Sequence, residues 1–263
     1  MSRLRPTHIT GFLRSLAIYH AVPGRARREK ALLRHLVASG DLCFDIGAHA
    51  GNRTRSLMQL GARVIAVEPQ PLFSGFLRWF FRARKDAVTV LPLALGAACG
   101  RAELKISPAN PTTSTLSQDF VTSARQTDGF RNIRWTERIA VDQTTLDRLI
   151  EDHGRPRYCK IDVEGHEADV LAGLSTPLPV ISVEYLGKSP SSAVQALARL
   201  QELGDYLYNA APGESMKFHF PCWLSAEEMV AWLEAGAEDQ DFGDIYAILA
   251  SEHTLLERLQ RQE

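Results

Sequence analysis

Residues 44–54 read FDIGAHAGNRT, a glycine-containing loop that follows a short apolar run and leads into a helical pattern. Open α/β sheets place nucleotides at such junctions, at the carboxyl ends of their strands. A dinucleotide-binding fingerprint would need glycines at positions 49 and 52 after Gly47, and His49 and Asn52 stand there instead. The stretch therefore predicts a nucleoside-binding loop and argues against NAD or FAD.

The glycine pattern that remains is D-x-G-x-x-x-G, formed by Asp45, Gly47 and Gly51. Such a loop suits a nucleoside whose tail carries an amino acid rather than phosphates. Glu68 closes the next apolar run about 20 positions after Gly47, where a carboxylate can accept hydrogen bonds from both ribose hydroxyls. Pro69 then ends the strand. Together these features predict a site for S-adenosylmethionine.

Short apolar runs alternate with helical patterns along most of the chain. The runs predicted as strands are 42–47, 63–68, 88–95, 158–164, 180–186, 205–210 and 244–250. The helical patterns between them are 52–60, 72–84, 144–152, 166–173 and 191–203. Strand–helix–strand repetition of this kind predicts an α/β fold with a doubly wound, mostly parallel sheet. Two further short strands, 102–107 and 137–143, are predicted between the third and fourth main strands.

The two ends of the chain differ in charge. Residues 1–34 contain eight Lys/Arg and one Glu, whereas residues 227–244 contain seven Asp/Glu and no Lys or Arg. We predict a basic helical cap over residues 1–38, followed by a Rossmann-like domain over 39–263. The cap is interpreted either as a solvated helical surface or as a basic surface for anionic lipid or an acidic partner. The acidic segment 225–236 is predicted as a surface helix with a capping box from Ser225 to Glu228.

A long polar segment, residues 107–130, is rich in hydroxyl side chains and proline. Structureless loops of this length are uncommon inside compact domains and often serve as lids or binding loops. Two interpretations stay open for this segment, a loop that covers the site and simple local disorder.

Composition excludes some classes of protein. The net charge is −1, whereas general nucleic-acid binders are usually basic, so we expect no nucleic-acid partner. No apolar run approaches the roughly 18–20 residues that a membrane-spanning helix needs. The four cysteines are dispersed without a C-x-x-C pair, which fits a reducing cytoplasm.

Six motifs, in this order and spacing, resemble the FkbM family of S-adenosylmethionine-dependent methyltransferases. They are DIGAHAGNRT (45–54), GARVIAVEPQP (61–71), LALGAACGRAEL (93–104), TTSTLS (112–117), VDQTTLDRL (141–149) and KIDVEGHEADVLAG (160–173). The resemblance covers about residues 41–186. It implies a class I methyltransferase fold, with a seven-stranded sheet and a C-terminal antiparallel strand. The sequence pattern itself adds N-terminal helices and an inserted hairpin to this expected fold. The resemblance also implies O-methylation of a hydroxyl on a sugar or secondary metabolite.

The resemblance carries over to individual residues. Asp45, Gly47 and Gly51 match the family's cofactor loop, and Glu68 matches its ribose-binding acid. The family commonly has Asn or a small polar residue at the position of His49, so it stays open whether His49 contacts the cofactor or the substrate. The full set expected to bind the cofactor is Asp45, Gly47, Ala48, His49, Gly51, Asn52, Glu68, Pro69 and Leu95.

The second signature, KIDVEGHE at 160–167, carries the candidate catalytic groups. Asp162 lies near a predicted strand tip, and Glu184 lies near the tip of the next strand, so the two carboxylates are expected to converge. Transfer to a hydroxyl needs removal of its proton, either by a general base or with the help of Mg²⁺. The candidate catalytic residues are Asp162, Glu164, His166 and Glu184, and the candidate Mg²⁺ ligands are Asp162 and Glu184.

Structural alternatives stand beside these roles. Glu164 is a candidate cap for the following helix, and His166 a candidate solvent-facing side chain. Glu167 is expected to complement the helix dipole, and Lys160 to pair with a carboxylate. No Asp/Asn-Pro-Pro-aromatic signature of amino-group targets occurs, which favours an oxygen target on a small molecule or glycan. A nucleotide-binding oxidoreductase and a catalytically idle scaffold of the same fold are the competing hypotheses.

Overall fold

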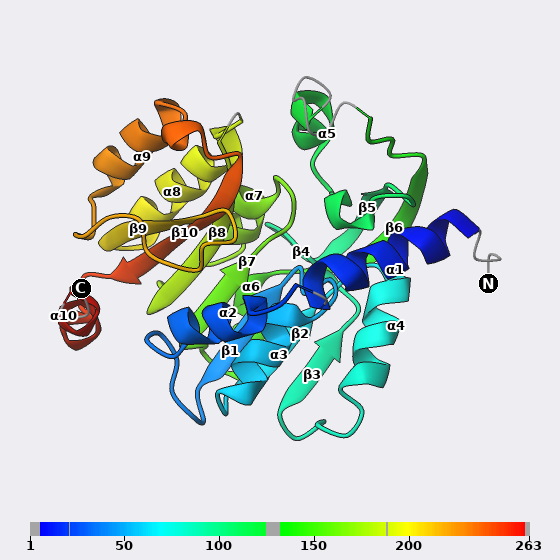
Figure 1. The fold of residues 1–263 in the computed structure, drawn as a ribbon, viewed down its shortest axis with the longest axis horizontal. Coiled ribbons are helices and arrows are strands. Elements are labelled where there is room, and N and C mark those ends of the chain that lie inside the picture. The colour runs from blue at the N-terminus through cyan, green and yellow to red at the C-terminus, as the bar shows by residue number, and fades with distance from the viewer. Residues whose placement is uncertain (1–5, 21, 125–131, 188, 261–263) are drawn as a thin grey trace.

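The computed structural model describes residues 6–20, 22–124, 132–187 and 189–260. A seven-stranded sheet runs through the molecule in the order β3-β2-β1-β7-β8-β10-β9 (Figure 1). Its strands are β3 (Val88–Leu91), β2 (Arg63–Val67), β1 (Leu42–Ile46), β7 (Tyr158–Ile161), β8 (Val180–Leu186), β10 (Phe242–Leu249) and β9 (Tyr206–Pro212). The strand β10 is antiparallel to both of its neighbours, and the pairs from β3 to β8 are parallel. The predicted sheet is therefore confirmed.

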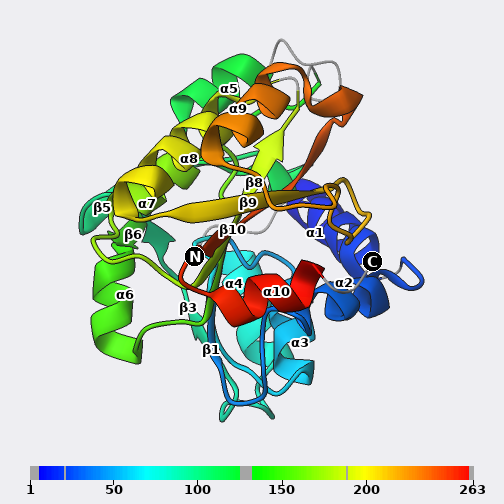
Figure 2. The same cartoon turned by 90° about the vertical axis from the view of Figure 1, so that its left-hand side faces the viewer.

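Helices cover both faces of this sheet (Figure 2). One buried core joins the strands to α6 (Leu146–His153), α7 (Glu167–Ala172), α8 (Ser191–Leu203) and α9 (Ala226–Glu234). The other joins them to α2 (Arg25–Leu33), α3 (Asn52–Gln59), α4 (Pro71–Phe80) and α10 (His253–Gln260). The central strands β1 and β7 are almost wholly buried, because both of their faces pack against helices. The helix α10 lies outside the helices predicted from the sequence.

Two predicted strands differ from the structure. The run 88–95 is not one strand: β3 ends at Leu91, and residues 94–95 form β4 (Ala94–Leu95) in a second sheet. Pro92 lies at the break and has no N–H to donate to a ladder. The run 158–164 ends as a strand at Ile161, because the chain turns into left-handed backbone at Glu164 and Gly165.

A small second sheet, in the order β4-β6-β5, forms the predicted insertion. The strands β5 (Gly100–Ile106) and β6 (Glu137–Thr144) pair antiparallel, and β4 pairs parallel to β6. Ala94, Leu104, Ile106 and Val141 form its buried core. The expected hairpin is thus present and carries a third short strand.

Residues 107–124 of the segment 107–130 have regular structure, so simple local disorder does not describe them. They contain the 3₁₀ turn η1 (Pro111–Thr113) and the helix α5 (Gln118–Ala124). The backbone N–H of Phe120 donates to Ser117 Oγ at the start of α5, and Phe120 is itself buried. One of the hydroxyl side chains of the segment therefore begins a helix, and residues 125–130 lie outside the described ranges.

The N-terminal segment forms two helices, α1 (Pro6–His20) and α2. The helix α1 packs on α4 through Phe12 and Phe73, whose ring centroids are 5.1 Å apart. The division into a cap at 1–38 and a domain at 39–263 stays a prediction. The capping box from Ser225 to Glu228 at the start of α9 is confirmed. In the described part of the chain, no helix has the length and apolarity needed to cross a bilayer.

Candidate active site

A cavity opens where β1, β2, β7 and β8 end, at the carboxyl edge of the sheet. It holds about 1190 Å³, a figure that includes solvent at its mouth. Its lining includes both the glycine loop and the carboxylates at the ends of β7 and β8.

The glycine loop forms one wall of the cavity and is fixed to the neighbouring strand. The backbone N–H groups of Gly47 and Ala48 both donate to the carbonyl oxygen of Val67, at 2.9 and 3.0 Å. Beneath them, Asp45 accepts a hydrogen bond from Thr54 Oγ1 at 2.5 Å. Burial raises the pKa of Asp45 to about 6 although this hydrogen bond and a nearby arginine oppose the shift. Asp45 thus anchors the loop from below.

Glu68 lies buried at the end of β2. Its Oε2 accepts from the N–H of His49 and its Oε1 from the N–H of Gln70, both at 2.8 Å. Each carboxylate oxygen has two lone pairs, so each keeps one for a further donor. Burial raises the pKa of Glu68 to about 7 even though both amide hydrogen bonds lower it. Glu68 also lines the cavity, so its carboxyl group is a candidate acceptor for hydroxyl groups of a ligand.

His49 occupies the position where a dinucleotide loop would carry glycine. Its φ of 44° is unusual for a residue with a side chain. The ring packs on Phe73 with centroids 4.0 Å apart, and the residue lines the cavity. This geometry places His49 at the boundary between the cofactor loop and α4.

Most of the residues predicted to bind cofactor line the cavity: Asp45, Gly47, Ala48, His49, Asn52, Glu68, Pro69 and Leu95. Gly51 does not line it. An ideal Cβ built on Gly51 would lie 2.5 Å from Leu77 Cδ2, and its φ is +77°. Gly51 therefore serves the packing of α3 against α4 instead of facing the cavity.

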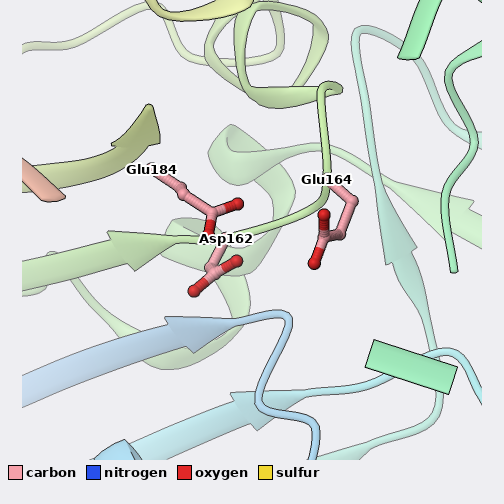
Figure 3. Close-up of side chains that lie close together, drawn as sticks. All are labelled: Asp162, Glu164 and Glu184. Atoms are coloured by element: carbon pink, nitrogen blue, oxygen red, sulfur yellow. The ribbon is translucent and has the colours of Figure 1, made fainter. Parts of the chain in front are cut away.

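Asp162, Glu164 and Glu184 form an acidic cluster on the opposite wall. Figure 3 shows their side chains directed toward one another from two strand ends and the loop between β7 and α7. One carboxylate oxygen from each lies within 4.8 Å of the others. Burial, and then the negative charge of neighbouring carboxylates, raise the pKa of both Glu164 and Glu184 well above the ordinary value. The predicted convergence of Asp162 and Glu184 is present, and Glu164 joins them.

Glu167 holds the loop that carries this cluster. Its Oε1 accepts from the N–H groups of Val163 and Gly165 at 3.1 Å, and its Oε2 accepts from Ser192 Oγ at 2.6 Å. Glu167, and not Glu164, is therefore the carboxylate that accepts amide hydrogen bonds at the start of α7. The side chain of Glu164 instead lies beside that of Asp162. The backbone carbonyl oxygen of Glu164 accepts a hydrogen bond from Thr115 Oγ1 at 2.7 Å.

A chain of alternating charges lies beneath the acidic cluster. Lys160 Nζ contacts Asp244 Oδ1 and lies 3.5 Å from Asp162 Oδ2. Arg53 continues the chain, with Nη2 2.9 Å from Asp244 Oδ2 and Nε 2.8 Å from Glu29 Oε1. Burial alone would raise the pKa of Asp244, but the two cations together lower it to about 2. The predicted pairing of Lys160 with a carboxylate is thus present twice.

The sequence analysis did not find Asp244, Arg53 or Glu29. Two of them had a weak signal, since Asp244 begins an otherwise apolar predicted strand and Glu29 is the lone acid of a basic segment. Along the chain, Arg53 is 191 positions from Asp244 and 24 positions from Glu29, so only the fold brings these charges together.

His166 lies at the start of α7 beside the cluster. Its Nδ1 is 3.0 Å from Asp169 Oδ2, and its side chain is 16 % exposed, so it does not face open solvent. Its Nε2 is buried and makes no hydrogen bond with the described residues. Burial lowers the pKa of His166, which favours the neutral ring. The residue lines the cavity, but Nε2 itself is closed off from water-sized molecules.

Two further segments line the cavity. Arg25 of α2 lies 2.8 Å from Glu214, and both residues are part of the lining. The segment 107–130, for which a loop that covers the site was one interpretation, contributes Thr112, Ser114, Thr115 and Leu116. The helix α2 and the described part of the 107–130 segment therefore both contribute to the walls.

Residues 45–210, more than half of the chain, match the sequence profile described as the methyltransferase FkbM domain. The chain belongs to this family, as its motifs predicted. It is therefore a member of a family of S-adenosylmethionine-dependent methyltransferases.

Two curated proteins are similar to this chain. The first is the hexuronic acid methyltransferase AglP of Haloferax volcanii, 24 % identical over 65 % of this chain and 69 % of that protein. The second is the ribosomal RNA small subunit methyltransferase A of Phenylobacterium zucineum, 25 % identical over 64 % of this chain and 61 % of that protein. Both are methyltransferases by name, and their acceptors differ in class.

Among solved structures, the chain is similar to a TehB-like S-adenosylmethionine-dependent methyltransferase from Corynebacterium glutamicum. The TM-score is 0.47 and the identity 12 %, over 90 % of this chain and 94 % of that one. The fold assignment made above rests on the strand order and directions of the sheet itself.

Proposed function

We propose that this chain transfers the methyl group of S-adenosylmethionine to a hydroxyl of a sugar or another small polyhydroxylated molecule. One observation carries the proposal: three carboxylates converge in the same cavity as the glycine loop and Glu68. Carboxylates are strong acceptors for hydroxyl protons. The similarity to the hexuronic acid methyltransferase AglP supports a sugar as the acceptor.

The residues of the glycine-loop wall fit the cofactor. Glu68 would accept the two ribose hydroxyls with its remaining lone pairs. Ala48, His49 and Asn52 would surround the amino-acid tail, and Leu95 supplies apolar surface to the base. When bound, S-adenosylmethionine supplies an electrophilic methyl group on a positively charged sulfur.

Asp162 is the group that we assign as general base. Its side chain is 37 % exposed, so the carboxylate reaches the cavity, while Lys160 holds it from below. With S-adenosylmethionine bound, Asp162 would hold the acceptor hydroxyl and would take its proton as the oxygen gains the methyl group and S-adenosylhomocysteine is released. General bases of this kind contribute about 10²–10⁴-fold to rate.

Glu164 and Glu184 have a different part in the proposal. Three carboxyl groups so close together do not all ionise near neutral pH, because like charges in a buried site repel. Their raised pKa values favour the protonated form, in which each can both donate and accept a hydrogen bond. They would therefore orient the neighbouring hydroxyls of a polyhydroxylated acceptor beside Asp162.

Two other ways to activate the hydroxyl use the same site. His166 has Asp169 to orient its ring, but its closed-off Nε2 makes it a poorer base than Asp162. The second way to activate the hydroxyl is a divalent cation, because the carboxylate oxygens of Asp162, Glu164 and Glu184 would suit Mg²⁺ as ligands. The proposal assigns the proton to Asp162 without a cation, and chelation tests that part.

A sugar is preferred over a nucleic acid as the acceptor, because the whole chain has a net charge of −1 and general nucleic-acid binders are usually basic. The similarity to a ribosomal RNA methyltransferase is the observation that favours RNA, so RNA belongs in the assay.

The test is transfer of a labelled methyl group to a panel of neutral sugars, uronic acids, amino sugars, polyols and RNA. We expect product from at least one sugar class, with the label on oxygen, and none from RNA. Asp162→Asn should reduce transfer by about 10²-fold or more, and the exposed surface variant Asp142→Asn should retain it. Methylation of RNA alone, or of nitrogen or carbon in every product, would overturn the proposal.

A further inference from the structure

Exposed apolar side chains gather on one part of the molecule. Seven large apolar residues of the described chain are exposed, and six of them lie in or directly after α1, or at the end of α4. The six are Ile9, Leu13, Ile18, Val22, Trp79 and Phe80. Scattered exposed apolar residues are ordinary, whereas such a concentration marks an interaction surface.

The residues of the two helices form a continuous surface. Phe12 of α1 lies 5.4 Å from Phe76 of α4, centroid to centroid. Phe76 in turn lies 6.0 Å from Trp79 and 5.5 Å from Phe80. Figure 1 shows α1 crossing beside α4. We call this surface the α1–α4 face and define it by Ile9, Leu13, Phe76, Trp79 and Phe80.

Basic side chains outnumber acidic ones on the two helices that carry the α1–α4 face and in the turn after α4. Residues 6–20 and 71–87 contain five Lys/Arg and one acidic residue, although the whole chain has a net charge of −1. The five are Arg14, Arg78, Arg82, Arg84 and Lys85, all exposed. The Arg82 guanidinium carbon lies 4.8 Å from the centroid of the Trp79 ring. These two segments therefore carry net positive charge, and at least Arg82 lies against a residue of the face.

We propose that the α1–α4 face docks on the surface of an anionic lipid bilayer. Helices that lie in the bilayer interface combine apolar side chains, tryptophan at the headgroup level and flanking Lys/Arg, which is the composition found here. Negative lipid headgroups attract such basic side chains. A second copy of this chain is a worse partner, because a two-fold contact would bring the same basic residues face to face.

This docking is a property of the surface and does not depend on the proposed reaction. Arg14 Nη1 donates to Asn110 Oδ1 at 3.0 Å, so α1 is fixed to the segment that precedes Thr112 and Ser114 at the cavity. A bilayer held by α1 would thus lie close to the segment that forms one wall of the cavity. Binding of lipid and transfer of methyl groups can nevertheless be measured separately.

The experiment is sedimentation of the purified full chain with phosphatidylcholine vesicles, with and without phosphatidylglycerol, at low and high salt. We expect binding to the anionic vesicles only, weakened by salt. Leu13→Ser combined with Trp79→Ser should abolish binding, and Arg82→Ala should weaken it about fivefold. The matched control is Arg148→Ala, an exposed arginine on α6, which should bind like the unaltered chain.

Two further readouts keep the result unambiguous. Brominated lipids should quench part of the tryptophan fluorescence, and that part should vanish in Trp79→Phe. Unchanged thermal unfolding and S-adenosylhomocysteine binding would show that the Leu13/Trp79 variant is folded. Absence of vesicle binding at low salt would overturn the proposal. So would equal binding by the Leu13/Trp79 variant, or a solution dimer that this variant dissociates without any lipid binding by the unaltered chain.

Discussion

The carbonyl oxygen of Asp162 occupies the place where a side chain on residue 47 would begin. An ideal Cβ built on Gly47 would lie 1.8 Å from that oxygen, and Gly47 has a φ of +82°. In addition, the N–H of Asp162 donates to the carbonyl of Ile46 at 3.0 Å. The glycine loop and the segment that carries the candidate base are therefore in direct backbone contact.

The first prediction follows from this contact. Gly47→Ala should lower the stability of the fold by about 1–3 kcal/mol from backbone strain alone. It should also weaken donor binding and reduce turnover, because the new methyl group must displace Asp162. Thermal unfolding, calorimetry with S-adenosylhomocysteine and initial rates measure the three effects.

Gly100→Ala is the matched control for this change, because a Cβ there meets no atom within 4 Å and its φ lies outside the left-handed region. If Gly47→Ala behaves like Gly100→Ala in all three measurements, the contact between residues 47 and 162 has no such importance.

The second prediction concerns pH and Glu68. Burial raises the pKa of this carboxyl to about 7, and ribose hydroxyls would donate to its ionised form. Binding then favours ionisation, so donor affinity should rise from about pH 6 to pH 8 and binding should release protons. Calorimetry in buffers of different ionisation enthalpy detects this release.

Variants at Glu68 separate charge from shape. Glu68→Gln should abolish the pH dependence, and Glu68→Ala should weaken donor binding by about 1.5–3 kcal/mol, because two hydroxyls lose a charged acceptor. Affinity for S-adenosylhomocysteine that is unchanged in both variants would refute the ribose assignment.

The third prediction concerns Asp162 and metal. Asp162→Asn keeps the shape of the side chain, removes its charge and should reduce turnover by about 10²-fold or more, with little change in donor affinity. Lys160 already places a positive charge 3.5 Å from Asp162 Oδ2, so turnover should survive a chelator. Loss of activity with chelator and recovery with Mg²⁺ would instead make Asp162, Glu164 and Glu184 metal ligands.

The fourth prediction concerns the buried charge chain. Asp244→Asn leaves Lys160 and Arg53 without their shared carboxylate, and should destabilise the fold by about 3–5 kcal/mol. Asp142→Asn removes an exposed ion pair and should change stability by less than about 1 kcal/mol. Urea unfolding of both variants at pH 7 measures the difference.

The pH dependence of this contribution has a definite sign. The pKa of Asp244 is about 2 in the folded chain, below its ordinary value. Its stabilising contribution should therefore be complete above about pH 4 and should be lost as the pH falls to about 2. Equal acid sensitivity of the unaltered chain and Asp244→Asn would contradict this assignment.

The sequence by itself determined the α/β fold, the glycine loop and the carboxylates at the strand ends. These are local signals: apolar runs of strand length, glycine at a turn, and acids directly after buried strands. Carboxyl ends of parallel strands share one edge of the sheet, so the approach of Asp162 and Glu184 followed from strand order alone. The motif spacing then gave the family.

Only the tertiary structure decided which groups surround those carboxylates. Glu29, Arg53 and Asp244 come from three distant elements, and their pairing depends on how α2, α3 and β10 pack. Gly51 matches the cofactor motif yet packs against Leu77, because its direction is set by α4. The α1–α4 face likewise required two helices to meet. Burial and long-range contact fix these features, and neither can be read from a single stretch of sequence.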